Sequence, residues 1–166
     1  MDKLWAPWRV KYVTKLIGKT KKCVFCRILR EKNDKKNFVF LHSRYCFAVL
    51  NIYPYNNGHS LVMPYRHIND LNKLTAAEEQ DLWKTLAETR KLLDKVLNPK
   101  GYNIGINLGR AAGAGFPGRI HTHIVPRWSG DVNFMPVTAG TKVISQSLQA
   151  LWAKLMAAQK KAYRKR

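Results

Sequence analysis

The chain has 166 residues, of which 46% are hydrophobic, and its 30 Lys and Arg against 10 acidic residues give a formal net charge of +20. This length supports one globular domain with a core and is too short for two ordinary domains. No run of about 18 apolar residues is present, and the first 20 residues lack the apolar middle of a signal peptide, so we expect a soluble, cytoplasmic protein without a membrane partner.

The positive charge gathers at the two ends of the chain. Residues 1–36 hold twelve Lys and Arg against three acidic residues, whereas residues 154–166 hold six against none. These ends are either solvated segments that keep the protein soluble or a positive field that attracts polyanions such as nucleotides and nucleic acid. Charge alone does not choose between these alternatives.

The N-terminal segment, residues 1–22, is basic and contains Trp5 and Trp8. It is too apolar for a free tail, so we expect an arm that packs on the domain. The domain itself is expected over residues 23–153, and residues 154–166 are expected to form the basic end of the last helix and a tail.

Short runs of β-branched and aromatic residues predict five strands. Residues 38–41 and 46–50 flank a polar turn and predict a β-hairpin. Further strands are predicted at 59–63, 102–108 and 120–125, the last two on either side of a loop of small residues.

Two helices are predicted. Thr75 and Glu78 form a capping box, in which the Thr75 hydroxyl accepts the Glu78 N–H and the Glu78 carboxylate reaches back. This helix is expected to run to about Leu97, and a second helix is expected from Ser145 onward. The mixed order of hairpins and helices indicates an α+β fold. The expected buried positions are Leu82, Leu86, Leu93 and Leu97 in the first helix and Leu148, Leu151, Trp152 and Leu155 in the second.

Two histidines follow the loop of small residues. His121 and His123 stand two residues apart, so they would face the same side of a strand. The backbone of the loop from Gly109 to Gly118 can bring N–H groups close to an anion. A neutral imidazole beside it can attack phosphorus and form a phosphoramidate, which a second nucleophile resolves. The pattern favours phosphate chemistry, with a metal pair as the alternative.

Residues 118–128 read Gly-Arg-Ile-His-Thr-His-Ile-Val-Pro-Arg-Trp, which resembles the motif of the histidine triad (HIT) superfamily of nucleotidyl hydrolases and transferases. The resemblance covers about residues 4 to 150 and is closest to a bacterial branch described as diadenosine tetraphosphate phosphorylase-like. It implies a HIT-like fold, in which an antiparallel sheet carries one long helix and a C-terminal helix and continues across a two-fold homodimer. Further similar segments are 4–9, 23–26, 47–51, 58–64, 67–68, 102–109 and 130–137.

The resemblance implies roles for four residues as catalytic groups. His121, the middle member of the triad, is implied as the nucleophile that becomes nucleotidylated, with its other ring nitrogen donating to a main-chain carbonyl. His123 is implied to bind and neutralise the phosphate, and His59 to be the fourth histidine of the site. Asn107 is implied to hold a phosphate oxygen or the surroundings of the nucleophile.

The resemblance also implies contacts with the substrate. Asn51 is expected to bond the ribose hydroxyls, and the loop glycines Gly113 and Gly115 to contact the anion. Trp128 is expected to lie near the substrate or across the dimer interface.

Arg119 departs from the family pattern, because it occupies the place of the first triad histidine. It is either a surface arginine without a role or a permanently charged group that contacts phosphate or an acidic neighbour, and we place it among the substrate-binding residues. Covalent chemistry at His121 remains possible with arginine at position 119, whereas a metal ion cannot be bound at that position.

Cys23 and Cys26 have the spacing of a zinc knuckle. In some relatives such a pair is completed by the histidine that corresponds to His67 and by the first triad histidine, but Arg119 cannot bind a cation. We expect Cys23, Cys26 and His67 to hold a structural zinc with a substitute ligand such as His42 or water, and two free thiols are the competing state. Catalysis is expected to need no cofactor.

The predicted activity is attack by His121 on the α-phosphorus of an adenosine-containing nucleotide or dinucleotide, followed by release of the nucleotide by phosphate or water. The resemblance favours phosphorolysis of diadenosine tetraphosphate to ATP and ADP. Hydrolysis of a dinucleoside polyphosphate or of a nucleoside phosphoramidate is the first alternative. The second, prompted by Arg119 and the basic ends, is a nucleotide- or nucleic-acid-binding protein with weakened catalysis.

Overall fold

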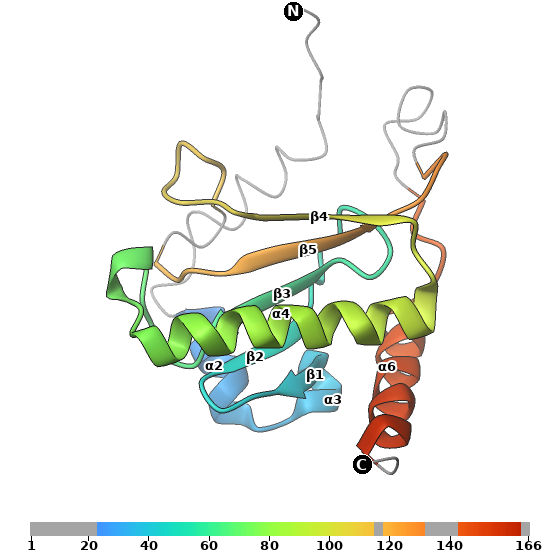
Figure 1. Ribbon diagram of the computed structural model, residues 1–166, viewed down its shortest axis with the longest axis horizontal. Coiled ribbons are helices and arrows are strands. Elements are labelled where there is room, and N and C mark those ends of the chain that lie inside the picture. The colour runs from blue at the N-terminus through green and yellow to red at the C-terminus, as the bar shows by residue number, and fades with distance from the viewer. Residues whose placement is uncertain (1–22, 115–117, 132–142, 164–166) are drawn as a thin grey trace, which may run out of the picture.

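Five strands form one antiparallel sheet in the order β1-β2-β3-β5-β4 (Figure 1). The computed structural model describes residues 23–114, 118–131 and 143–163, so the predicted N-terminal arm lies outside the described residues. The α+β class and the antiparallel sheet are confirmed. The strands are β1 (Val39–His42), β2 (Cys46–Leu50), β3 (Ser60–Pro64), β4 (Gly101–Ile106) and β5 (Thr122–Arg127).

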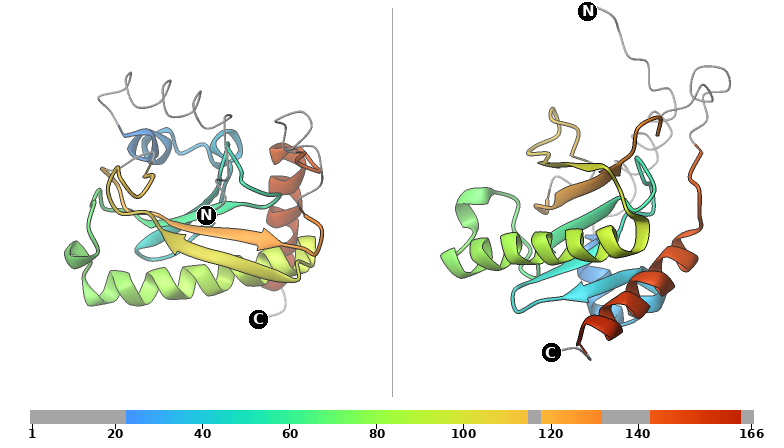
Figure 2. Two further views of the ribbon diagram at one scale, coloured as in Figure 1. Left: turned by 90° about the horizontal axis from the view of Figure 1, so that it is seen from above. Right: turned by 45° about the vertical axis from the view of Figure 1, so that its right-hand side comes forward.

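Helices cover both faces of the sheet. Figure 2 shows the long helix α4 on one face and the short helices α2 and α3 on the other, with α6 at one end. In the part of the chain that the structure describes, no helix has the length and apolar character needed to cross a membrane. The helices are α2 (Val24–Glu31), α3 (Asp34–Asn37), α4 (Ala76–Leu97) and α6 (Leu148–Tyr163), and a 3-10 turn, η1, spans Leu71–Lys73.

The larger core lies between α4, α6 and the sheet. Leucines spaced along α4 are buried against Val62 and Ile124, as their helical spacing predicts. Leu151 and Leu155 of α6 extend this core, with exposed fractions of 1% and 0%. Leu97 is only partly buried, because it ends the last turn of α4.

The second core lies on the opposite face, beneath α2. Phe25 of α2 is 4% exposed and packs in one cluster with Phe47, Leu61 and Met63 of the sheet. This packing explains a helix that the sequence analysis missed. The helix spans only eight residues and its N-cap, Cys23, makes no side-chain capping bond, so the burial of Phe25 rather than a local signal stabilises it.

The hairpin and β3 lie within one residue of their predicted positions, whereas the end of β4 and both ends of β5 differ by two residues. β4 ends at Ile106, and β5 begins at Thr122, so His121 lies immediately before its strand instead of within it. Helix α4 has the predicted capping box and ends before Asn98, which adopts a left-handed conformation with φ 46°.

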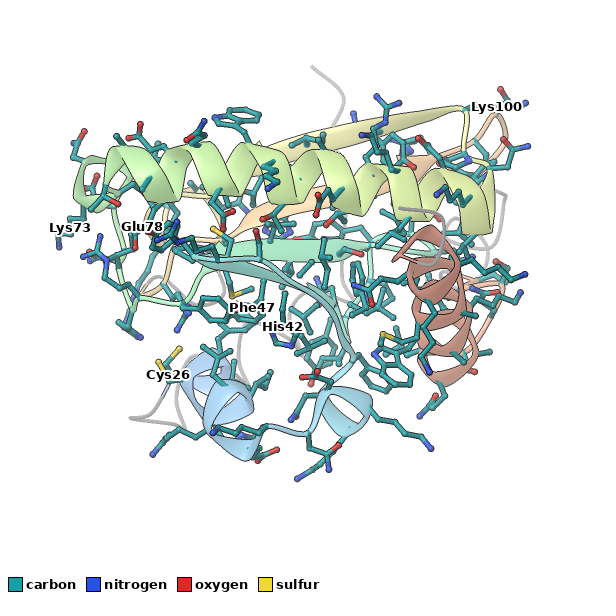
Figure 3. The ribbon with its side chains drawn as sticks, turned by 60° about the horizontal axis from the view of Figure 1, so that its bottom comes forward. Cys26, His42, Phe47, Lys73, Glu78 and Lys100 are labelled. Carbon is teal, nitrogen blue, oxygen red and sulfur yellow. The ribbon has the colours of Figure 1, made fainter. Side chains whose placement is uncertain are left out.

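Glu78 anchors the start of α4 (Figure 3). Its carboxylate accepts hydrogen bonds from Arg66 Nε and Nη2 at 2.7 and 2.6 Å and from the Thr75 N–H at 2.9 Å. The bonds from Arg66, with those from Thr75, lower the pKa of Glu78 from 4.5 to about 2. The ionised carboxylate therefore stabilises the fold fully above pH 4.5 and loses this effect as the pH falls towards 2.

We expect Glu78→Gln to lower the free energy of unfolding at pH 7 by about 1–3 kcal/mol, because charge-assisted hydrogen bonds are lost. Urea denaturation of both proteins measures this difference, which should shrink as the pH falls below 4.5, the ordinary pKa of the carboxyl. Glu79→Gln is the matched control, since Glu79 is the exposed neighbour on the same turn. Equal losses in the two variants would contradict the anchoring role.

Candidate active site

Three histidines meet on the sheet face opposite α4. In the strand register, Leu61 of β3 and Gly105 of β4 both pair with His123, which places His123 on the face that carries the Phe25 cluster. The ring centroid of His123 lies 5.0 Å from that of His121 and 5.1 Å from that of His59. The predicted pair and the predicted fourth histidine therefore form one cluster.

His121 has one ring nitrogen tied to the main chain. Its Nδ1 lies 2.8 Å from the carbonyl oxygen of Arg119, and a carbonyl only accepts, so Nδ1 carries the proton. In the neutral ring the lone pair is then on Nε2. Burial to 5% exposure and the Phe25 ring, whose centroid lies 5.8 Å away, hold the imidazole in place.

The environment of His121 favours its neutral form. Burial lowers the pKa of the imidazole below its ordinary value of 6.5, and the positive charge of Arg119 acts in the same direction. The hydrogen bond to the Arg119 carbonyl opposes these effects without cancelling them. A neutral imidazole with a lone pair on Nε2 is a nucleophile at neutral pH.

For a reaction in which His121 is the nucleophile, the acid limb is therefore expected below pH 6.5, the ordinary pKa of histidine. A lowered pKa means that the neutral ring persists to lower pH, so attack continues where an exposed histidine would already be protonated. Rapid-quench measurement of covalent intermediate formation from about pH 5 to about pH 8 checks this expectation. An acid limb at or above pH 6.5 would contradict it.

A chain of hydrogen bonds sets the proton positions of His59 and His123. The N–H of Tyr55 donates to His59 Nδ1 at 3.0 Å, and the amide of Asn51 lies 3.3 Å from the same nitrogen. His59 Nδ1 is therefore an acceptor, and the proton of the neutral ring is on Nε2. This Nε2 lies 2.9 Å from His123 Nδ1, so the proton of a neutral His123 is on its own Nε2. The relay presents a hydrogen-bond donor at His123.

The two predicted asparagines follow different strands, Asn51 after β2 and Asn107 after β4. Asn107 follows the pair of Ile106 with Thr122, so the antiparallel register places it on the face of His121. Asn51 follows β2 and is half-buried, and its Oδ1 accepts the N–H of Tyr53 at 3.0 Å while its amide faces His59. Asn51 thus takes part in the relay.

The loop of small residues closes on itself in the part that the structure describes. Gly109 and Gly113 have φ values of +77° and +84°, which favour glycine. The N–H of Gly113 donates to the Arg110 carbonyl and that of Ala114 to the Gly109 carbonyl, so these two donors are used within the loop. Gly115 lies outside the described residues.

Trp128 lies beyond the far end of β5 and is half-buried, with its main-chain N–H donating to the Asp131 carboxylate. It stands five positions after His123, about 16 Å along an extended strand. Within one chain, therefore, Trp128 is not brought together with the histidines.

Arg119 does not point to solvent. Its side chain is 2% exposed, and Nη2 donates to the carbonyls of Pro64 and Tyr65 while Nη1 donates to Cys26 Sγ at 3.2 Å. The prediction that Arg119 contacts phosphate is therefore corrected, because its side chain is buried and bonds groups of the protein itself. The guanidinium finds carbonyl acceptors at the end of β3, which the sequence around position 119 does not indicate.

The predicted metal ligands come together beside Arg119. Cys23, Cys26 and His67 each offer one donor atom, and these atoms lie within 4.8 Å of one another. The suggested substitute, His42, is directed elsewhere, with its ring nitrogens 2.8 Å from the Tyr65 hydroxyl and 3.0 Å from an Asp34 oxygen.

Sequence reasoning missed two contributors to the site. Phe25 contacts the His121 ring, and the main-chain N–H of Tyr55 orients His59. Phe25 lies inside the zinc-knuckle spacing, which drew attention to its cysteine neighbours. A main-chain donor has no residue signature, so Tyr55 offered no signal.

Comparisons with known proteins agree with the fold. A family model described as the HIT domain matches residues 32–130. An AP-4-A phosphorylase of Mycobacterium tuberculosis is 35% identical over 156 residues, covering 90% of this chain and 80% of the relative. An asymmetrical bis(5'-nucleosyl)-tetraphosphatase of Schizosaccharomyces pombe is 36% identical over 93 residues, covering 56% and 50%.

Two solved structures share the fold. A hypothetical histidine triad nucleotide-binding protein from Sulfolobus tokodaii has a TM-score of 0.70 at 22% identity, covering 86% of this chain and 95% of its own. A zinc-bound histidine triad family protein from Mycobacterium smegmatis has a TM-score of 0.69 at 24% identity, covering 87% and 98%.

Proposed function

Because the chain belongs to the HIT domain family, we propose that it is an enzyme that cleaves adenosine-containing dinucleotides through a covalent nucleotidyl-histidine. The relatives named as a phosphorylase and a tetraphosphatase support a dinucleoside polyphosphate as the substrate. The observation that carries the proposal is the hydrogen bond from His121 Nδ1 to the Arg119 carbonyl, because it leaves the Nε2 lone pair for attack.

The reaction proceeds in two displacements. In the first, Nε2 of His121 attacks the α-phosphorus, the bond from this phosphorus to the bridging oxygen breaks, and the leaving polyphosphate takes the electron pair. In the second, an ionised oxygen of phosphate attacks the same phosphorus, or a water oxygen attacks it and releases a proton to the solvent. The P–N bond breaks and returns its electron pair to Nε2. The proton stays on Nδ1 throughout, hydrogen-bonded to the Arg119 carbonyl, so the imidazole does not accumulate two protons.

The neighbouring side chains stabilise the charge that develops on the phosphoryl oxygens. His123 donates from Nε2, and His59 fixes this tautomer through the bond of 2.9 Å between the two rings. Asn107, on the same face, holds a phosphoryl oxygen, and Asn51 bonds the ribose hydroxyls and steadies His59. No step needs a cofactor, because side chains provide the nucleophile and the donors.

Phosphate is the proposed second nucleophile, and the products from diadenosine tetraphosphate are then ATP and ADP. The 35% identity with the phosphorylase over most of both chains supports this choice. Hydrolysis would instead yield ATP and AMP, which matches the activity named for the tetraphosphatase relative.

The test supplies diadenosine tetraphosphate with and without labelled inorganic phosphate and separates the products by anion-exchange chromatography. Phosphorolysis produces ADP with the label in its β-phosphate, and only when phosphate is present. AMP without phosphate would indicate hydrolysis. The enzyme proposal fails if neither dinucleoside polyphosphates nor phosphoramidates are cleaved, and salt-sensitive nucleic-acid binding unchanged by His121→Ala would then favour a binding protein.

We also propose a two-fold dimer in which the sheet continues between subunits. β4 is an edge strand, and its Ile104 is 49% exposed on the side of α4, where Trp83 is 69% exposed. A partner that pairs with β4 would cover these apolar groups and the open main-chain edge.

Sedimentation velocity should give twice the mass of one chain, and Ile104→Glu should shift the protein to monomer. A monomeric wild-type protein would contradict the proposal.

A further inference from the structure

The cluster of Cys23, Cys26 and His67 has the chemistry of a zinc site but lacks one ligand. Two sulfurs and an imidazole are a common zinc set, and a zinc-bound family member has the same fold. Cys26 Sγ and His67 Nδ1 are 3.2 Å apart, a hydrogen-bonding distance. A structural zinc ion takes four ligands. Among the described residues, these three form the only group of metal-binding side chains found.

The guanidinium of Arg119 contacts the cluster at Cys26. Nη1 donates to Cys26 Sγ at 3.2 Å, and Nη2 donates to two main-chain carbonyls at the end of β3. The Arg119 side chain is 2% exposed, whereas Cys26 is partly exposed and His67 is exposed. A guanidinium has no acceptor and keeps its positive charge, so it cannot serve as the fourth ligand.

A zinc ion does not fit beside this charge. Zinc bound to Cys26 would lie about 2.3 Å from the sulfur, and so within about 5.5 Å of Arg119 Nη1, given the 3.2 Å contact. Repulsion between the buried guanidinium and a dication bound beside it opposes binding. The cluster therefore offers three metal ligands, and a permanently charged guanidinium lies beside them.

We propose that Arg119 replaces the structural metal ion of this cluster. A metal would join α2, the segment after β3 and the segment before β5. Arg119 joins the same three places, through Cys26, through the carbonyls of Pro64 and Tyr65, and through its own main chain. The cross-link holds α2 and its Phe25 against the His121 ring. The fold of this region is then independent of zinc.

Metal analysis of the purified full chain tests the proposal directly. Wild-type protein should contain far less than one equivalent of zinc, should show no thiolate-to-cobalt absorption when titrated with Co²⁺, and should keep its melting temperature in a chelator. One tightly held zinc per chain, with a melting temperature that falls on chelation, would overturn the proposal. These readouts do not depend on catalytic activity, so they are independent of the proposed reaction.

Arg119→His restores a fourth ligand and should convert the cluster into a metal site. This variant should bind one equivalent of zinc, show tetrahedral cobalt absorption and melt at a higher temperature with zinc than with chelator. Adding Cys26→Ser to Arg119→His is the matched control and should remove these effects. Zinc binding by wild type as tight as by Arg119→His would show that Arg119 does not exclude the metal.

Arg119→Met tests the cross-link separately from the metal. The change removes the donors to two carbonyls and the thiol while keeping a long side chain, so the melting temperature should fall by on the order of 10 °C. Zinc should not restore it, because methionine leaves the site with three ligands. A variant that melts like wild type would show that the guanidinium does not act as a cross-link.

Discussion

Replacing His121 with alanine is expected to abolish the covalent intermediate and to lower turnover by at least about 10⁴-fold, because the nucleophile is lost. Single-turnover mixing with diadenosine tetraphosphate, followed by alkaline denaturation, should preserve the P–N bond of the wild-type intermediate. Intact mass should then increase by one adenylyl group in the wild type and remain unchanged in His121→Ala.

The matched control is His42→Asn, which removes a histidine outside the cluster. The ring of His42 bonds Tyr65 and Asp34. Among the contacts of the described residues, none joins His42 to the three clustered histidines. Its variant should form the intermediate at the wild-type rate. If His121→Ala turned over at a rate similar to wild type, phosphate or water would attack the substrate directly and the covalent route would be wrong.

Removing His59 and His123 together is expected to reduce the maximal rate no more than removing His123 alone. His123 donates to the phosphoryl group, so His123→Ala should lower kcat by about 10²–10³-fold, as the loss of a preorganised donor does. His59 acts through the bond of 2.9 Å that sets the tautomer of His123, so His59→Ala should reduce kcat with little change in KM. Steady-state kinetics of both single variants and the double variant form the cycle that measures the coupling.

Strong non-additivity in this cycle supports the relay. Multiplicative losses in the double variant would mean that His59 contacts the substrate independently, and the relay would be wrong. A circular dichroism melt of each variant separates these effects from unfolding. His42→Asn again serves as the control for removing an imidazole.

The local elements of the fold could be predicted because their signals are short-range. The capping box of Thr75 and Glu78 lies within four residues, and the hairpin needs only two β-rich runs and the turn between them. Helix α2 could not be predicted in the same way, because the burial of Phe25 against three distant strands stabilises it. Tertiary packing decides the conformation of such short segments.

In the candidate site, too, some features could be predicted from the sequence and others depend on the tertiary structure. Spacing alone predicted that His121 and His123 share a face, and the resemblance to the family implied that His59 is the fourth histidine of the site. The resemblance also implied that a ring nitrogen of His121 donates to a main-chain carbonyl, and the structure has this contact with Arg119. The sequence does not indicate which nitrogens of His59 and His123 carry protons, because that depends on the Tyr55 N–H and on a contact across 64 positions.

Sequence by itself therefore determined the class of fold, the family and the clustered histidines, because these follow from local periodicity and from a contiguous motif. Only the tertiary structure decided the role of Arg119. Its partners lie 55, 54 and 93 positions away at Pro64, Tyr65 and Cys26, where folding brings two carbonyls and a sulfur to one buried guanidinium. A charged side chain in the interior takes its role from the groups that compensate it, and these groups assemble only when the chain folds.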